Sequence, residues 1–125
     1  MAVFAWQEFL QLAEQMEADR KTFGMNEAIR RSAASRAYYS CYHEAESMAL
    51  ARGYVHSSRN NHAQLITWLL SQQNQTLCTM GGQLLTLKKQ RVHADYCTRR
   101  FSPHNAKQAV SQAREFIALA HTLTR

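Results

Sequence analysis

Glycine and proline are scarce in this chain of 125 residues, which contains four and one of them respectively. Together they are 5 of 125 residues, or about 4%, against roughly 12% in an average protein. Because β-sheet proteins use these residues in their many turns, the scarcity argues against an all-β fold. Hydrophobic residues make up 46% of the chain and aromatic residues 10%, which argues against disorder.

Cysteines and long apolar segments are also few. Cys41, Cys78 and Cys97 are widely spaced and form no CxxC pair, a pattern typical of reduced proteins without disulfides or a zinc site. No basic segment followed by an apolar one opens the chain, so no secretion signal is expected. The longest apolar run, near 65–70, is too short to span a bilayer. We therefore expect a cytoplasmic protein with no membrane partner, metal or cofactor.

Acidic residues are outnumbered, and the imbalance is local. Fifteen Lys and Arg against nine Asp and Glu give a net charge of +6. Residues 1–19 contain four acids and no Lys or Arg, so the remaining chain carries 6 − (−4) = +10. This excess favours phosphate-bearing partners, such as RNA or a nucleotide. The residues predicted to bind nucleic acid are Lys88, Lys89, Arg99 and Arg100.

Apolar residues recur at helical spacing along most of the chain. The predicted helices are 3–22, 26–52, 61–72, 83 to about 98, and 103 to about 120. Gly24 and Gly53 are expected to end the first two helices, and Asn26 and Ser102 to act as N-caps. Whether the fourth helix begins before or after Gly81-Gly82 is left open. Long helices with short loops pack antiparallel, so we predict one all-α domain over 1–125, an up-down bundle of four to five helices.

Polar residues interrupt the second predicted helix on the side expected to face the core. Arg36 lies there among small residues, and His43 follows two turns later on roughly the same face. A buried Arg needs a partner, and the structural interpretation is an ion pair between Arg36 and Asp95, with Arg91 as another partner for Asp95. The functional interpretation is a phosphate site. Four tyrosines are expected either to pack in the core or an interface, or to stack on bases: Tyr38, Tyr39, Tyr42 and Tyr96.

Two motifs resemble those of small prokaryotic HEPN domains, the nucleotide-binding domains shared by higher eukaryotes and prokaryotes. The first is Ser35-Arg36-Ala37-Tyr38-Tyr39 with His43 four residues further on, and the second is Arg91-Val92-His93-Ala94-Asp95-Tyr96. A His-containing segment at 56–65 and an Ala-rich last helix ending in Phe116 also fit in order. The resemblance covers nearly the whole chain.

This resemblance implies an antiparallel helical bundle that forms a two-fold dimer and acts as a metal-independent endoribonuclease in toxin–antitoxin or phage-defence systems. Some such proteins work with a nucleotidyltransferase antitoxin. The family's catalytic pattern is an Arg followed by a His after four to six residues, and Arg36 with His43 fits it. In such a pair the Arg stabilises charge at phosphorus and the His moves a proton, while Arg91 would hold phosphate.

One departure from the family pattern supports a second hypothesis. Many active members carry their catalytic pair late in the fourth helix, whereas here Val92 follows Arg91, and Asp95 and Tyr96 stand where a His is often found. A carboxylate at this position would repel phosphate. The alternative is a non-catalytic HEPN module that binds a nucleotide or RNA, or serves as an adaptor for a partner protein. Both hypotheses are open on the sequence alone.

Overall fold

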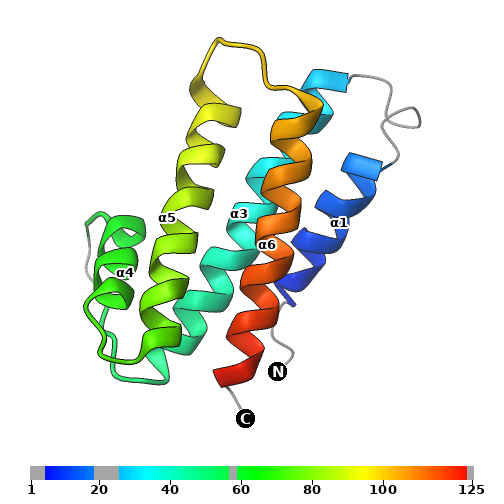
Figure 1. Ribbon diagram of the computed structural model, residues 1–125. Helices are drawn as coiled ribbons and strands as arrows, with labels where there is room; N and C mark the ends of the chain where they lie inside the picture. Colours follow the sequence, from blue (N-terminus) through cyan, green and yellow to red (C-terminus); the bar gives the residue numbers. More distant parts are fainter. Residues whose placement is uncertain (1–4, 19–25, 57–58, 124–125) are drawn as a thin grey trace.

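Five packed helices make up the fold in the computed structural model, which describes residues 5–18, 26–56 and 59–123. They are α1 (Gln7–Ala18), α3 (Asn26–Leu50), α4 (Asn61–Leu70), α5 (Gln75–Tyr96) and α6 (Pro103–Leu123). No strand occurs in these ranges, which confirms the all-α prediction. α1 and α5 run antiparallel to α3 and α6, and the short α4 lies beside the first half of α5 (Figure 1). None of the described helices is long and apolar enough to cross a membrane.

Most predicted helix ends lie close to the observed ones. The predicted helix over 3–22 is present as α1, while 3–4, 19–22 and Gly24 lie outside the described residues. The N-cap at Ser102 is confirmed, since its Oγ accepts a hydrogen bond from the Asn105 N–H at 3.1 Å. After α3, Gly53 has a φ of 100°, the left-handed conformation that glycine adopts readily at the end of a helix.

The open question about Gly81-Gly82 has a clear answer, because both glycines lie inside α5. This helix begins eight residues earlier than the predicted start at 83, and Asn74 caps it by accepting a hydrogen bond from Leu77 N–H at 3.1 Å. A Cβ atom on Gly81 would lie 3.0 Å from both the Leu69 Cβ and the Leu70 backbone nitrogen. Gly81 therefore permits the close approach of α4 to α5, which compensates for its poor helix propensity.

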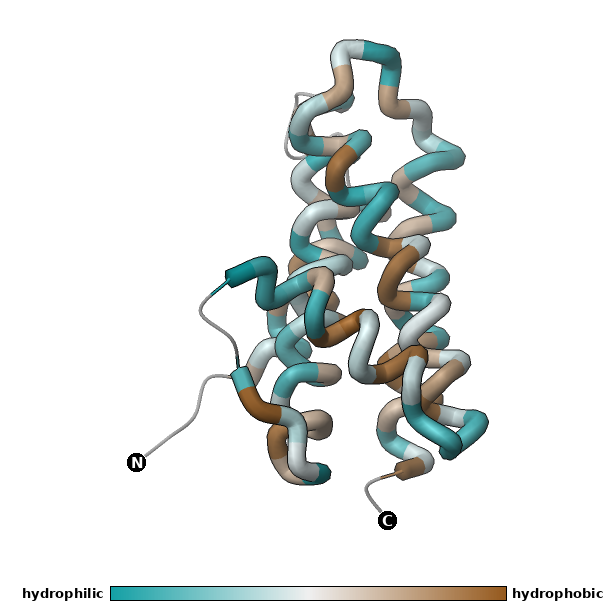
Figure 2. Tube along the Cα trace, turned by 90° about the vertical axis from the view of Figure 1, so that its left-hand side faces the viewer, coloured by the Kyte–Doolittle hydropathy of each residue, from teal (hydrophilic) through white to brown (hydrophobic). Residues whose placement is uncertain are grey.

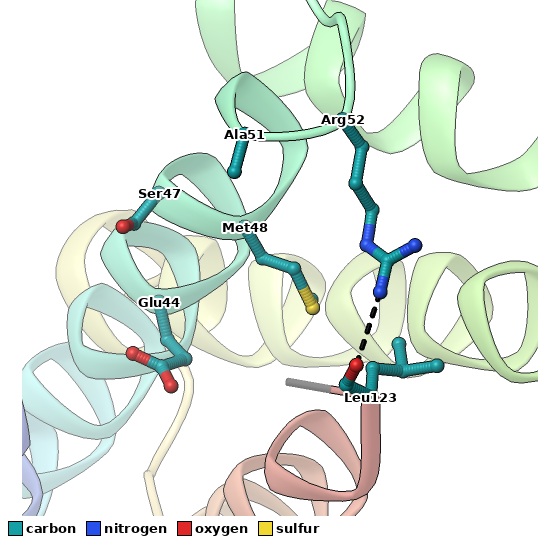
Figure 3. Close-up of a pocket in the computed structure, with 6 residues that line it drawn as sticks. All are labelled: Glu44, Ser47, Met48, Ala51, Arg52 and Leu123. Atoms are coloured by element: carbon teal, nitrogen blue, oxygen red, sulfur yellow. Dashed lines mark hydrogen bonds between the residues drawn. The ribbon is translucent and has the colours of Figure 1, made fainter. Parts of the chain in front are cut away.

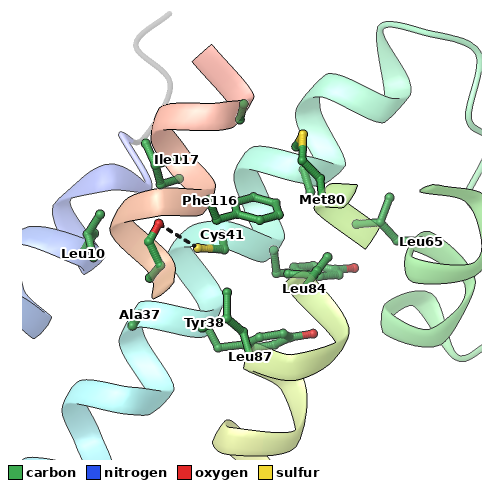
Figure 4. Packing of buried hydrophobic residues seen from close by; sticks show 14 of the residues in the cluster. Leu10, Ala37, Tyr38, Cys41, Leu65, Met80, Leu84, Leu87, Phe116 and Ile117 are labelled. Carbon is green, nitrogen blue, oxygen red and sulfur yellow. Dashed lines mark hydrogen bonds between the residues drawn. The ribbon is translucent and has the colours of Figure 1, made fainter. Parts of the chain in front are cut away.

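The main core lies between α3, α5 and α6, with α1 and α4 closing its sides (Figure 4). Hydrophobic positions alternate with hydrophilic ones along the helices, as amphipathic packing requires (Figure 2). Cys41 lies at the centre, where its Sγ donates to the Ala113 carbonyl at 3.6 Å. Burial raises the pKa of this thiol, so Cys41 behaves as a small core residue.

Two consecutive arginines fasten α3 to the connection between α5 and α6. The Arg31 guanidinium donates to the carbonyls of Ala94 and Cys97, both at 2.8 Å, and also to those of His93 and Arg99. The first two of these residues, His93 and Ala94, belong to the last turn of α5, and Cys97 and Arg99 follow it. Carbonyls at the end of a helix are short of helical donors, and Arg31 supplies a donor to them. Arg30 is buried, and its Nε donates to the Phe101 carbonyl at 2.8 Å. The two side chains therefore fix the connection that leads from α5 into α6.

Candidate functional site

Arg91 lies against three tyrosine rings on the side of the bundle formed by α3 and α5. Its Cζ is 5.5 Å from the ring centroids of Tyr38 and Tyr39 and 5.8 Å from that of Tyr96. The side chain is only 13% exposed. Burial alone lowers the pKa of Arg91, but Tyr39, Tyr96 and Asp95 raise it by more, so the guanidinium stays charged. We call Arg91, Tyr38, Tyr39 and Tyr96 the arginine–tyrosine cluster.

Asp95 pairs with Arg91 rather than with Arg36. Its Oδ2 is 3.4 Å from Arg91 Nη1 and accepts a hydrogen bond from Ser35 Oγ at 3.3 Å. Arg36 follows Ser35 directly, and one residue turns a helix by about 100°, so Arg36 lies on a different side of α3 from Ser35. Its Nε is buried and has no hydrogen-bond partner among the described residues. Among the described residues, Asp95 forms its ion pair with Arg91, the other predicted partner, and no ion pair joins it to Arg36.

The predicted catalytic pair Arg36 and His43 is not assembled. The two are seven positions apart along α3, which is about 10 Å of helix. The His43 ring stacks on Trp6 with centroids 3.6 Å apart, and its Nδ1 is 3.5 Å from Glu46 Oε1. Within the residues that the structure describes, no contact joins Arg36 to His43. Arg91, the third predicted catalytic residue, lies near His43 through Tyr39, whose ring contacts both side chains.

The four tyrosines divide into structural and accessible residues. Tyr38 and Tyr42 are buried, and the Tyr42 hydroxyl donates to Glu46 Oε2 at 3.2 Å. They cannot stack on a base without disrupting the core. Tyr39 is half-buried, whereas Tyr96 is 72% exposed at the end of α5. Of the four, Tyr96 offers the accessible ring face that base stacking requires.

His62 belongs to this region although the sequence did not indicate it. It lies in the first turn of α4, where its ring stacks on Tyr42 with centroids 4.0 Å apart. Its Nδ1 is 2.5 Å from the Tyr38 hydroxyl. Burial, with contributions from the charges of Arg91 and Lys88, lowers the pKa of His62, so the ring is neutral at pH 7. The signal available in the sequence was the Tyr38 and Tyr42 pair, which one turn of α3 places on the same face.

The predicted nucleic-acid-binding residues do not all share one face. Lys88 precedes Arg91 by three residues, lies on the same side of α5 and acts electrostatically on His62. Lys89 is exposed but turned about 160° from Arg91 around the helix. Arg99 and Arg100 are exposed in the connection that follows Tyr96. Lys88 thus lies on the Arg91 side of α5, Arg99 and Arg100 follow the end of that helix, and Lys89 lies on another side of it.

A cavity of about 470 Å³ lies elsewhere, at the C-terminal ends of α3 and α6 (Figure 3). The Arg52 guanidinium crosses its edge and donates to the Leu123 carbonyl at 3.1 Å. None of the predicted site residues lines this cavity. In the described part of the chain, no group of three or more His, Cys, Asp or Glu side chains is arranged to hold a metal ion.

The fold and this region define a small five-helix protein with a charged arginine held among tyrosines. In comparisons with known proteins, the sequence matches no protein-family model and no curated protein. The HEPN resemblance therefore stays a prediction that rests on the two motifs.

Proposed function

We propose that this protein is a HEPN-like module that binds single-stranded RNA through the side of α5 that carries Arg91 and Tyr96. The observation that carries the proposal is the exposed Tyr96 ring next to the Arg91 guanidinium, with exposed Arg99 and Arg100 following it. Aromatic rings bind bases by stacking and Arg or Lys side chains bind the phosphates, and this combination is typical of single-strand binding.

The arrangement of Arg91 supports phosphate binding rather than catalysis. Its guanidinium is positioned by three rings and by Asp95, so little side-chain entropy is lost when a ligand binds. Of the nitrogens of the Arg91 guanidinium, Nη1 is the one that is paired with Asp95. A ribonuclease also needs a group that accepts a proton from the 2′-hydroxyl, and the His43 predicted for that task is covered by Trp6 and paired with Glu46.

The test is the binding of a short fluorescent single-stranded RNA, measured by anisotropy as salt is raised from about 50 to about 200 mM. If Lys88, Arg91, Arg99 and Arg100 each contact a phosphate, log K should fall against log salt with a slope of about −3. Arg91→Ala and Tyr96→Ala should each weaken binding about tenfold. Lys89→Ala is the matched control on another side of α5 and should leave the affinity nearly unchanged. No measurable binding by the wild type would refute the proposal.

A second candidate function is the metal-independent endoribonuclease implied by the resemblance. One observation favours it, since Arg91 and the neutral His62 both contact Tyr38 and Tyr39 and so bring an Arg and a His together. RNA cleavage in excess EDTA should then be lost in folded His62→Ala protein. Loss of cleavage in His43→Ala protein instead would support Arg36 and His43 as the catalytic pair. If the wild type binds RNA but does not cleave it, the endoribonuclease function is refuted and the binding function stands.

The resemblance also adds a two-fold dimer and a partner protein, such as a nucleotidyltransferase antitoxin, to the proposal. Sedimentation equilibrium of the purified chain tests the dimer. A sedimenting mass close to that of the 14.4 kDa monomer at high protein concentration would exclude it. Co-purification with a nucleotidyltransferase encoded next to this protein tests the partner.

A further inference from the structure

One nitrogen of His62, Nε2, is accessible beside the arginine–tyrosine cluster. Its Nδ1 is taken by Tyr38, while Nε2 has no partner among the described residues and is not a buried atom. The ring is held on two sides, by stacking on Tyr42 and by an edge contact with Tyr39, whose centroid is 6.0 Å away. His62 therefore presents Nε2 outward from a fixed position.

The Tyr38 hydroxyl decides which nitrogen of His62 carries the proton. This hydroxyl is buried, and His62 Nδ1 is its one hydrogen-bond partner in the part of the chain that the structure describes. Burial raises the pKa of Tyr38, so the phenol keeps its proton. A buried hydroxyl proton needs an acceptor, and Nδ1 is the acceptor at hand. The neutral imidazole must then hold its own proton at Nε2.

The charges around His62 favour this neutral form. Arg91 and Lys88 on α5 and His43 on α3 act against a positive charge on the ring, and Glu46 on α3 partly offsets them. Three further titratable side chains, Tyr38, Tyr39 and Tyr42, pack against the ring. At neutral pH, His62 is thus an uncharged N–H donor next to a permanent cation.

We infer that His62 and Arg91 together bind an RNA phosphate, with the Nε2–H of His62 donating to a non-bridging oxygen and Tyr38 fixing that proton. The inference rests on the proposed function and deepens it. An imidazole that already holds its proton at Nε2 cannot take one from a 2′-hydroxyl there. This nitrogen consequently binds phosphate at neutral pH and does not act as the general base.

The inference has a test in two parts. The first measures the protonation of both ring nitrogens in ¹⁵N-histidine-labelled protein by long-range ¹H–¹⁵N correlation at about pH 7.5. His62 should show a bare Nδ1 and a protonated Nε2, and Tyr38→Phe should allow both tautomers. A His62 ring with its proton at Nδ1 in the wild type would overturn the inference.

The second part measures the affinity for a short fluorescent oligouridine RNA. His62→Ala should weaken binding about tenfold at pH 7.5, as expected for a lost hydrogen bond to a charged group. His62→Gln offers an amide N–H near the position of Nε2, so its affinity should stay within about threefold of wild type. Thermal unfolding of each variant shows that it is folded.

Lowering the pH should change the RNA affinity of the wild type and of His62→Gln differently. Protonation of His62 below its lowered pKa adds a second cation, so wild-type affinity should rise more than that of His62→Gln as the pH falls through the range in which the ¹⁵N spectra show His62 becoming protonated. Equal affinity of folded His62→Ala and wild type would overturn this inference and leave the RNA-binding function standing. RNA cleavage that depends on His62 at neutral pH would also overturn it. A wild type that binds no RNA would refute the proposed function itself.

Discussion

Gly81 and Gly82 are neighbours in the same helix, and the structure predicts opposite effects for the same substitution at each. A Cβ atom on Gly82 would meet no atom within 4 Å, whereas one on Gly81 would meet Leu69 and Leu70 of α4 at 3.0 Å. The Leu70 atoms include the backbone nitrogen, which cannot move without shifting α4. The pair therefore separates intrinsic helix propensity from helix–helix packing.

The magnitudes follow from these contacts. Replacing Gly by Ala inside a helix favours folding by about 1 kcal/mol, so Gly82→Ala should raise the free energy of unfolding by about 0.5–1 kcal/mol. Gly81→Ala gains the same helix propensity, but forcing a methyl group into a filled interface lowers the free energy of unfolding by about 1–3 kcal/mol. The net loss should be about 1 kcal/mol. The two variants should then differ by about 2 kcal/mol in stability.

Urea unfolding followed by circular dichroism measures this difference, and thermal unfolding checks it. For a domain of this length, 1 kcal/mol corresponds to about 4 °C in Tm, so the two variants should unfold about 8 °C apart. Equal m-values would show that both variants unfold over the same surface. If Gly81→Ala is as stable as Gly82→Ala, then α4 does not approach α5 as closely as described, and the explanation for Gly81 is refuted.

Three further predictions concern stability and reactivity. Arg31→Ala should lower the free energy of unfolding by about 2 kcal/mol, because the carbonyls of Ala94 in α5 and Cys97 after it lose a charged donor. Arg31→Lys should recover only part of this loss in urea unfolding. Double-mutant cycles should give a coupling of about 0.5–1 kcal/mol between Arg91 and Asp95 and none between Arg36 and Asp95; the reverse result would contradict the assigned ion pair. Cys41 should react with an aromatic disulfide reagent only after unfolding, whereas rapid reaction of all three thiols in the folded protein would contradict its burial.

The sequence predicted the helices well because their signals are local. The cap at Ser102, followed by proline at the first helical position, determines where α6 begins. The start of α5 was not predictable to the same degree, since two consecutive glycines disfavour a helix interior. Packing against α4 explains Gly81 but not Gly82, and this contact joins segments separated by a turn whose geometry the sequence does not specify.

The site was harder to predict because it depends on the rotation of each helix about its axis. Both motifs contribute to it through Tyr38, Tyr39 and Arg91. The sequence left two partners open for Asp95, Arg36 and Arg91, and the structure pairs it with Arg91. A shift of one residue along α3, from Ser35 to Arg36, is enough to turn a side chain to another face. His62 was missed because α4 reaches Tyr38 only through the tertiary fold.

The hydrogen bonds from Arg30 and Arg31 to the segment after α5 should affect its cleavage by proteases. Arg99 and Arg100 are exposed, and trypsin cleaves after arginine in chains that can extend into its active site. Here the carbonyls of Cys97, Arg99 and Phe101 are bonded to α3, so the segment must first detach from α3. Trypsin should therefore cut this surface connection slowly in the folded protein and quickly in Arg31→Ala. Resistance at this point comes from a helix sixty or more residues earlier in the chain.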